Sequence, residues 1–357
     1  MAYREKILVA LSGGIDSAVS AWSLYQLGYE VIGITFKLWE YINNEKYCNN
    51  LCCSEKVISA AKSICEKIGC EFIVRDVSKS FYNKVVTDFV NEYQSGHTPN
   101  PCIICNPHIK WKYLLHVADE LKIKRVATGH YARINRSLSG KLNLLRSLDK
   151  GKDQSYFLYR LTQEQLGRTI FPVGHISKSQ VRIMAAKEAL AISSHRESQE
   201  LCFLPDGGLK YFLQEFAPDA AKQGKIVDST DRTIGTHKGI AFYTIGQRSG
   251  LGGGFKQPMY VTKIIPEENK IVIGPVDKLF REEFNVTDIN WIIPKEKEFL
   301  CTVQIRHNHK DTPAVVYPDG DNARVIFKQP QPAIAPGQSA VFYQNPVVIA
   351  GGTIIGD

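Results

Sequence analysis

The stretch Leu11-Ser12-Gly13-Gly14-Ile15-Asp16-Ser17 decides the fold of this chain. The apolar run at 7–11 that leads into it has the length and composition of a buried strand. After it, apolar residues recur over 18–27 at the spacing of a helix face, and Gly28 follows where a helix would end. The pattern predicts a strand-to-helix turn, whose backbone N–H groups and helix dipole favour an anion.

This turn differs from the Walker-type phosphate loop. It lacks Gly-Lys-Ser/Thr at the required spacing, and Asp16 brings a negative charge into it. The simpler alternative is an ordinary turn between strand and helix, but Asp16 and Ser17 complete a much rarer pattern. The order Ser-Gly-Gly-x-Asp-Ser resembles the PP-loop of ATP pyrophosphatases. Those enzymes cleave ATP between its α- and β-phosphates and adenylate a carbonyl oxygen.

Length and composition limit the class of protein. The 357 residues suffice for two or three domains, and 44% hydrophobic with 22% charged residues is typical of a globular protein. The net charge of +8 is compatible with a polyanionic partner. No apolar run reaches the ~18 residues of a membrane span, and no signal peptide precedes the first strand, so we expect a cytoplasmic protein without a membrane partner. The nine cysteines are interpreted as reduced thiols, some of them catalytic or metal-binding.

Further apolar runs predict the rest of a parallel sheet. They lie at 30–36, 71–77 and 124–128 and alternate with helical patterns, which indicates an α/β domain. Phe36 and Gly129 stand at the carboxyl ends of two of these runs, where open α/β sheets bind ligands.

The second half of the chain has a different character. From about 205 it has short β-like runs with many glycines, and from about 278 it has six short strands, which suggest a small barrel. We therefore predict three domains: a catalytic domain at 1–204, a central domain at 205–277 and a β-barrel at 278–357.

Several cysteines leave a catalytic and a structural interpretation open. Asn106 and Pro107 are predicted to start a helix, which would put Cys105 at its N-terminus, where the dipole and Lys110 favour a thiolate. Cys102-x-x-Cys105 is alternatively half of a zinc site, but no second pair completes it. The cluster formed by Cys48, Cys52 and Cys53 fits packing better than metal binding for a similar reason. By itself Cys202 is only a cysteine in an apolar strand.

Two polar segments are also ambiguous. His130 follows Gly129 at the sheet edge that carries the phosphate turn, which favours a functional role over that of a loop residue. Lys152-Asp153-Gln154 follows a loop rich in Ser, Gly and Lys, and its simpler interpretation is a solvated charge run.

Seven collinear motifs make the chain similar to the tRNA-specific 2-thiouridylases, the enzymes that put sulfur on C2 of the wobble uridine. The motifs are Ser12–Ser17, Asn100–Asn106, Gly129–Tyr131, Lys152–Gln154, Ser198–Phe203, Tyr243–Arg248 and Pro336–Ser339. The resemblance covers nearly the whole chain. It implies a PP-loop domain with a parallel sheet, a small central domain and a C-terminal β-barrel that binds tRNA.

The resemblance also implies a role for each matching residue. Cys202 is expected to carry a persulfide and Cys105 to be its partner nucleophile. Asn100, Pro101 and Cys102 match the segment that meets the target base. The expected ATP-binding residues are Ala10, Leu11, Ser12, Gly13, Gly14, Ile15, Asp16, Ser17, Phe36 and Gly129. The expected tRNA-contacting residues are His130, Lys152, Asp153, Gln154, Arg306, His307 and Gln338. No resident metal ligands are expected.

The chemistry implied is an ATP-dependent sulfur transfer. ATP with Mg²⁺ would adenylate the uridine carbonyl oxygen and release pyrophosphate. The oxygen would then be able to depart as part of AMP, a good leaving group. Sulfur would then come from the Cys202 persulfide, by direct attack or as hydrosulfide released by Cys105, and a Cys105–Cys202 disulfide would close. The partners implied are the anticodon region of tRNA and a persulfide donor protein, and a monomer is expected.

One departure and two alternatives stay open. Some family members have an aspartate where Cys102 stands, so any acid–base role of that carboxylate needs another group here. A PP-loop enzyme with nitrogen chemistry, of the amidotransferase type, would need neither paired cysteines nor an RNA-binding barrel. An iron–sulfur or redox-sensing RNA binder could use Cys102, Cys105 and Cys202 as ligands.

Overall fold

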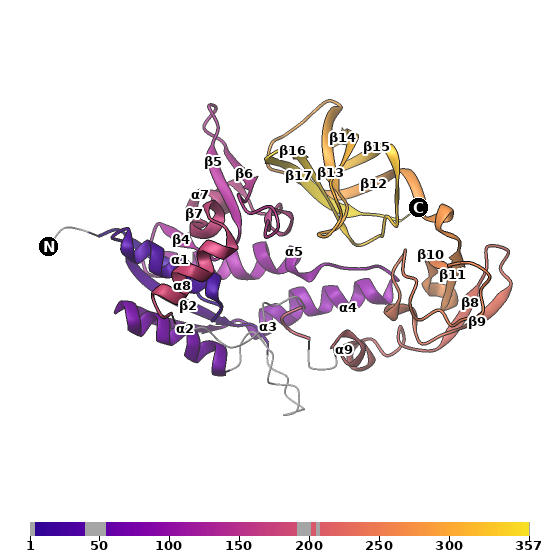
Figure 1. Cartoon of the computed structure of the whole chain (residues 1–357), viewed down its shortest axis with the longest axis horizontal. Helices are drawn as coiled ribbons and strands as arrows, with labels where there is room; N and C mark the ends of the chain where they lie inside the picture. The colour runs from indigo at the N-terminus through magenta and orange to yellow at the C-terminus, as the bar shows by residue number, and fades with distance from the viewer. Residues whose placement is uncertain (1–3, 40–54, 191–200, 205–207, 357) are drawn as a thin grey trace. The chain divides into compact units, whose positions relative to one another are not determined.

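The computed structural model describes residues 4–39, 55–190, 201–204 and 208–356 (Figure 1). The chain divides into two compact units. The first comprises Met1–Val85, Cys102–Asp206 and Asn345–Val348, and the second comprises Val86–Pro101, Gly207–Gln344 and Ile349–Asp357. Within the described parts of the chain, no helix has the length and apolarity needed to cross a membrane.

The first unit is built on a five-stranded parallel sheet. Its strand order is β3 (Glu71–Asp76), β2 (Glu30–Lys37), β1 (Lys6–Ala10), β4 (Arg125–Ala127) and β7 (Thr169–Ile170). Ile7, Leu8 and Val9 of β1 are fully buried, as expected for a parallel strand covered on both faces. The apolar runs therefore form the parallel sheet that the sequence predicts.

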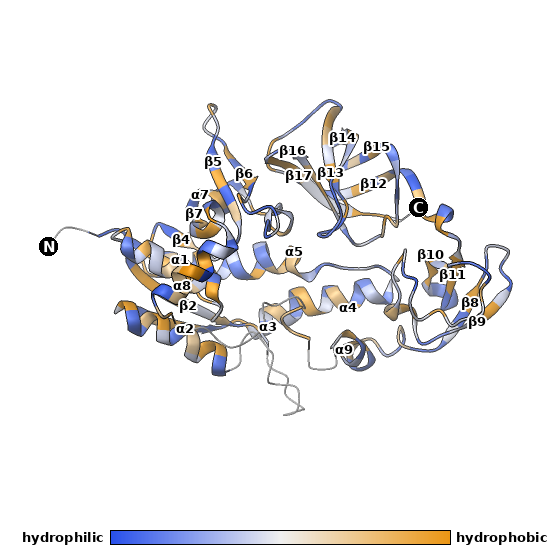
Figure 2. Cartoon of the chain, in the orientation of Figure 1, coloured by the Kyte–Doolittle hydropathy of each residue, from blue (hydrophilic) through white to orange (hydrophobic). Residues whose placement is uncertain are grey.

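Helices cover the two faces of this sheet. Helices α1 (Ile15–Gln26), α2 (Glu55–Ile68) and α8 (Lys178–Lys187) share one core with Ile7 and Val9. Helix α6 (Lys112–Glu120) contacts β1 and β4. Apolar and polar residues alternate along α2 in Figure 2, which is the pattern of a helix that buries one face only.

The helix that carries Cys105 begins earlier than the sequence predicts. It runs from α5 (Pro101–Cys105) through a π-helical segment, η3 (Asn106–Trp111), into α6. The expectation that Asn106 caps its start is wrong, and Cys105 lies inside the helix while Cys102 lies in its first turn. Pro107 lacks an N–H and its ring crowds the preceding turn, so the wider π-turn lets the helix continue.

The remaining elements of the first unit are short. A hairpin is formed by β5 (Ala132–Arg136) and β6 (Leu142–Arg146), followed by η4 (Ser155–Phe157), α7 (Gln163–Arg168) and η5 (Pro172–His175). Upstream, α3 (Ser78–Phe81), the π-helical η2 (Tyr82–Val86) and α4 (Thr87–Gln94) follow one another without a break and lead from the first unit into the second.

The second unit contains a small sheet and a closed barrel. Helix α9 (Gly208–Phe216) precedes the sheet, whose order is β10 (Tyr260–Ile265), β11 (Lys270–Gly274), β8 (Gly224–Val227) and β9 (Thr233–His237). Short 3₁₀ turns lie at η6 (Ile240–Phe242), η7 (Pro266–Glu268) and η8 (Val276–Leu279).

The barrel has the six strands that the sequence predicts. Its order is β12 (Phe280–Trp291), β15 (Asn322–Pro332), β14 (Thr312–Asp319), β13 (Phe299–Gln304), β16 (Ser339–Gln344) and β17 (Val347–Ile354). Strand β17 pairs back with β12, which closes the barrel and removes its open edges. The predicted fold class, a parallel-sheet domain followed by a barrel, is confirmed.

Candidate functional site

The phosphate turn is folded by its own serines. Helix α1 begins at Ile15, and no side chain caps it at Gly14. The Ser17 hydroxyl donates to the Gly14 carbonyl (2.9 Å) and accepts from the Ser12 N–H (3.2 Å). Gly13 has φ +69°, and a Cβ there would lie 2.8 Å from the Val57 carbonyl oxygen, so only glycine fits. The turn therefore presents the positive end of α1 without a side-chain cap.

Gly129 packs directly against this turn. A Cβ on Gly129 would lie 2.7 Å from the Ser17 nitrogen and 2.8 Å from the Asp16 carbonyl carbon. Strands β1 and β4 are neighbours, while the chain leaving β1 returns on its other side as β2. Such a reversal of strand order opens a crevice at the carboxyl edge of a parallel sheet. The Gly13-Gly14 turn and Gly129 therefore lie together at the carboxyl edge of the sheet, where the strand order reverses.

A buried lysine that sequence reasoning missed holds Asp16. The Lys178 ammonium lies 2.8 Å and 2.7 Å from the two carboxylate oxygens of Asp16, and the Tyr131 hydroxyl donates to the same carboxylate (2.7 Å). Lys178 is only 6% exposed. Ser177 caps α8 in a capping box with Gln180, which puts Lys178 in the first turn of this helix. The local sequence around Lys178 does not indicate Asp16 as its partner, because the two residues lie 162 positions apart.

Cys102 is electrostatically coupled to Cys202. Burial raises the pKa of the Cys102 thiol to about 11, Lys110 acts to lower it, and the charge of Cys202 raises it further. Cys102 is therefore a neutral thiol near pH 7, and Cys202 lies within its electrostatic reach. Cys105 is 4% exposed. The structure thus gathers Cys102, Cys202 and Lys110, with Cys105 on the same helix as Cys102.

Cys202 lies in a turn rather than in the apolar strand that the sequence suggests. The Leu204 N–H donates to the Leu201 carbonyl (3.1 Å). The next side chain, Phe203, is buried and packs edge-on against Phe81 of α3, with ring centroids 5.6 Å apart. The turn is thereby anchored beside Cys202. The neighbouring motif residues 198–200 lie outside the described residues, as do Cys48, Cys52 and Cys53.

His130 is held in an aromatic environment. Its ring lies 5.4 Å from that of Trp111 and 6.4 Å from that of Phe171, and Nδ1 lies 2.9 Å from the Thr128 hydroxyl. Burial, with a smaller contribution from the charge of Lys110, lowers the pKa of His130 to about 3. The imidazole is therefore neutral near pH 7 and offers hydrogen bonds rather than a charge.

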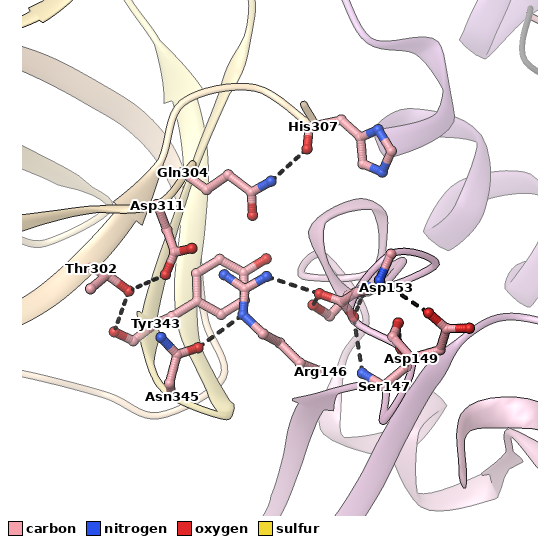
Figure 3. A network of polar contacts seen from close by, with 12 residues as sticks. Arg146, Ser147, Asp149, Asp153, Thr302, Gln304, His307, Asp311, Tyr343 and Asn345 are labelled. Atoms are coloured by element: carbon pink, nitrogen blue, oxygen red, sulfur yellow. Dashed lines mark hydrogen bonds and ion pairs between the residues drawn. The ribbon is translucent and has the colours of Figure 1, made fainter. Parts of the chain in front are cut away.

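Asp153 organises the segment 152–154. Its carboxylate accepts hydrogen bonds from Arg146 (2.9 Å) and from the Ser147 N–H (3.0 Å), and Arg146 also donates to Asn345 (2.9 Å), as Figure 3 shows. Gln154 joins the segment to the sheet edge, since its side-chain oxygen accepts the Tyr131 N–H (2.9 Å). The charge-run interpretation does not hold for Asp153, whose side chain is 7% exposed.

The barrel residues belong to the second unit. Arg306 and His307 follow β13, where Gln304 donates to the His307 carbonyl (2.6 Å) and shapes the loop (Figure 3). Gln338 donates to the carbonyl of Thr98 (2.6 Å), and the Thr98 N–H donates to the Pro336 carbonyl (3.0 Å). Gln338 therefore holds the chain two residues before Asn100. In the part of the chain that the structure describes, no three His, Cys, Asp or Glu side chains gather as metal ligands.

Comparisons with known proteins identify the family. A model described as the tRNA methyl transferase HUP domain matches residues 5–206. The chain is 42% identical to the tRNA-specific 2-thiouridylase MnmA of Carboxydothermus hydrogenoformans, with 98% of each chain covered. The chain belongs to the tRNA-specific 2-thiouridylase family. It is therefore an enzyme of the sulfurtransferase class, as predicted.

Further relatives, domain models and solved structures are similar to this chain. The MnmA of Chloroflexus aggregans is also 42% identical, again over 98% of each chain. Models of a tRNA methyl transferase PRC-barrel domain and of an aminomethyltransferase beta-barrel domain match residues 210–275 and 281–354. Among solved structures, the U34-tRNA thiolase NcsA of Methanococcus maripaludis with its [4Fe-4S] cluster aligns at 20% identity and a TM-score of 0.35, covering 60% of this chain and 67% of that one.

Proposed function

We propose that this chain thiolates C2 of the wobble uridine in tRNA, using ATP to activate the base and a persulfide on Cys202 as the sulfur source. The observation that carries the proposal is the placement of the phosphate turn, Cys102, Cys105 and Cys202 in one compact unit. A PP-loop enzyme of nitrogen chemistry has no use for the cysteines. Two reactive centres in one unit fit a reaction in which activation and sulfur transfer follow each other on one bound base.

In the first step the turn binds ATP. The backbone of 11–17 and the α1 dipole face the phosphates, while Phe36 and Gly129 border the nucleotide at the neighbouring strand ends. The uridine C2 carbonyl oxygen attacks the α-phosphorus, pyrophosphate leaves, and the oxygen becomes part of an AMP leaving group. Mg²⁺ would be held chiefly by the phosphates and would neutralise their charge, because the Asp16 carboxylate of the turn is paired with Lys178.

In the second step sulfur moves to the base. The terminal sulfur of the Cys202 persulfide attacks C2, AMP departs, and Cys105 attacks the inner sulfur of Cys202, which leaves a Cys105–Cys202 disulfide and 2-thiouridine. Release of hydrosulfide by Cys105 before the attack gives the same products. Reduction of the disulfide completes the cycle, and a persulfide donor protein reloads Cys202.

Catalysis and tRNA binding are assigned to different domains of the chain. We propose that 1–204 carries the chemistry, that 205–277 is a central domain and that the barrel at 278–357 binds the anticodon region of tRNA. Gln338 supports this view, because it holds the backbone just before the target-base segment Asn100-Pro101-Cys102. His130, the segment 152–154 and the Arg306-His307 pair are the further tRNA contacts. The enzyme works as a cytoplasmic monomer in this proposal.

The test measures both product and covalent state. Purified chain is incubated with unmodified tRNA, ATP, Mg²⁺ and a persulfide donor, and the wobble nucleoside is analysed by mass spectrometry. Cys202→Ser should form neither persulfide nor product, whereas Cys105→Ser should accept sulfur on Cys202 and fail to release it. Cys301→Ser is the matched control, since Cys301 is a buried barrel cysteine outside the motifs, and it should keep full activity. Peptide mapping without reductant after one turnover should show the Cys105–Cys202 linkage, and full single-turnover activity of either motif variant contradicts the proposal.

A further inference from the structure

Helix α2 ends in a backbone motif that brings two cysteines together. The Gly69 N–H donates to the Glu66 carbonyl (3.2 Å), the Cys70 N–H donates to the Cys65 carbonyl (2.9 Å), and Gly69 has φ +67°. This pair of bonds around a left-handed glycine is the Schellman motif, in which the side chains at the Cys65 and Cys70 positions contact each other. The two thiols are therefore neighbours because of how the helix stops.

The glycine of the adjacent strand completes the setting. A Cβ on Gly33 of β2 would lie 2.3 Å from the Cys65 sulfur, so the sulfur occupies the space that a side chain would fill. The Gly33 backbone also hydrogen-bonds to both thiols, which places both sulfur atoms against the same stretch of strand. The contact between the two cysteines is thus fixed from the helix side and from the sheet side.

The two thiols are not equivalent. Cys65 is 1% exposed, whereas Cys70 is half-buried. A hydrogen bond from the Cys65 thiol lowers the pKa of Cys70, and the same interaction together with burial raises the pKa of Cys65. A more exposed thiol with a lowered pKa next to a buried thiol is the arrangement of an attacking and a resolving cysteine.

We propose that Cys65 and Cys70 form a dithiol–disulfide pair, a redox modification site separate from the sulfur-transfer cysteines. The oxidant is a low-molecular-weight disulfide, RSSR. The Cys70 thiolate attacks one sulfur of RSSR, RS⁻ leaves, and a mixed disulfide forms. Cys65 then loses its proton to RS⁻ and attacks the Cys70 sulfur, which expels the second RS⁻. One RSSR is thereby reduced to two thiols, while Cys65 and Cys70 lose two electrons and two protons.

The thiol pair and the phosphate turn lie against opposite ends of helix α2, so the redox chemistry of the pair does not require the uridine reaction. The pair closes the C-terminal end of α2, while Val57 near the other end contacts Gly13 of the phosphate turn. A disulfide needs Cα atoms about 4.4–6.8 Å apart, and a Schellman closure brings its two positions into direct side-chain contact. The bond can therefore form with α2 and its C-cap in place.

The test uses the full-length reduced chain and oxidised glutathione. Tryptic digestion without reductant separates Cys65 and Cys70 into the peptides 63–67 and 68–75, because Lys62, Lys67 and Arg75 precede the cuts. We expect these two peptides to be linked, with loss of two hydrogens, and to separate on treatment with dithiothreitol. Cys65→Ser should instead retain a glutathione adduct on Cys70, and Cys70→Ser should leave Cys65 unmodified. Cys301, buried in the barrel, is the internal control and should stay a thiol.

Two results would overturn the inference. One is a stable glutathione adduct on Cys70 in the unaltered chain without linkage to Cys65. The other is equal alkylation rates of Cys65 and Cys70 in the native reduced protein, because the proposal requires Cys70 to react first. The alkylation measurement needs no variant, so it decides the question even if a serine substitution disturbs folding.

Discussion

At the residue scale, the protonation state of Cys102 limits the acid–base role that it can take in the proposed reaction. Burial raises the pKa of its thiol to about 11, so near pH 7 the position carries a neutral S–H group. A carboxylate at the same place would be charged and could accept a proton. If Cys102 meets the target base as proposed, it can donate a weak hydrogen bond but cannot act as a general base at that pH. The charge of Lys110 acts on both Cys102 and His130.

The Lys178–Asp16 pair leads to a prediction about ATP. Without the ammonium, Asp16 would repel phosphates at the turn and lose the group that orients it. Lys178→Met should weaken binding of a non-hydrolysable ATP analogue by about tenfold or more, which is about 1.4 kcal/mol. It should also lower the free energy of unfolding by about 3 kcal/mol, because a partly buried carboxylate loses its counter-charge. Calorimetric titration and urea unfolding measure the two effects.

A double variant separates this interaction from general damage. Adding Asp16→Asn to Lys178→Met should recover part of the lost stability, since no unpaired charge then remains. Lys187→Met, at the exposed end of the same helix α8, is the control and should change neither quantity. Wild-type nucleotide affinity in Lys178→Met would refute the role assigned to the pair.

At the scale of elements, the site depends on how strand ends meet helix starts. Gly129, which follows β4, touches the backbone of Asp16 and Ser17 at the first turn of α1. The helix over 101–120 passes through a π-turn at Pro107, and there the Asn106 side chain donates to the Phe157 carbonyl (2.9 Å) instead of capping a helix. Both features place functional residues through backbone geometry rather than through side-chain chemistry.

Gly129→Ala is the sharpest test at this scale. The added methyl would lie below 3 Å from backbone atoms of the turn, which cannot move without displacing α1. We expect a loss of about 1–3 kcal/mol in the free energy of unfolding and a larger proportional loss of nucleotide affinity. Gly253→Ala is the control, because nothing lies within 4 Å of a Cβ there. Equal nucleotide affinity in both variants would count against the turn as the nucleotide site.

At the scale of the whole molecule, the net charge of +8 bears on RNA binding. Contacts between basic side chains and phosphates release counterions, so the tRNA dissociation constant should rise steeply with salt concentration. Arg306→Gln should weaken binding and reduce the slope of log K against log salt by about one. Lys222→Gln, an exposed lysine of the second unit without an assigned tRNA contact, should leave the slope unchanged. Filter binding over a salt series measures this, and an unchanged slope in Arg306→Gln would remove that residue from the interface.

Local patterns account for most of the fold that the sequence predicts. The 18–27 helix, the strands of the parallel sheet and the six strands of the barrel follow from apolar periodicity and from glycine at helix ends, which act within a few residues. The family also follows from the sequence, because seven motifs in one order are specific even when each alone is not. The predicted start of the helix that carries Cys105 is wrong. A proline normally marks a helix start, whereas here a π-turn accommodates Pro107 inside the helix.

Only the tertiary structure decided which side chains meet. Lys178 pairs with Asp16 across 162 residues, and Cys202 acts on Cys102 across 202 − 102 = 100 residues. Cys65 and Cys70 are neighbours because of the local Schellman motif at the end of α2, and packing against Gly33 of β2 buries the Cys65 sulfur. No local pattern encodes the Lys178–Asp16 and Cys202–Cys102 pairings, because sequence spacing carries no information about long-range contacts that the packing of strands and helices creates. The sequence by itself determined the elements and the family, and the packing determined which charges are neutralised and which thiols can react.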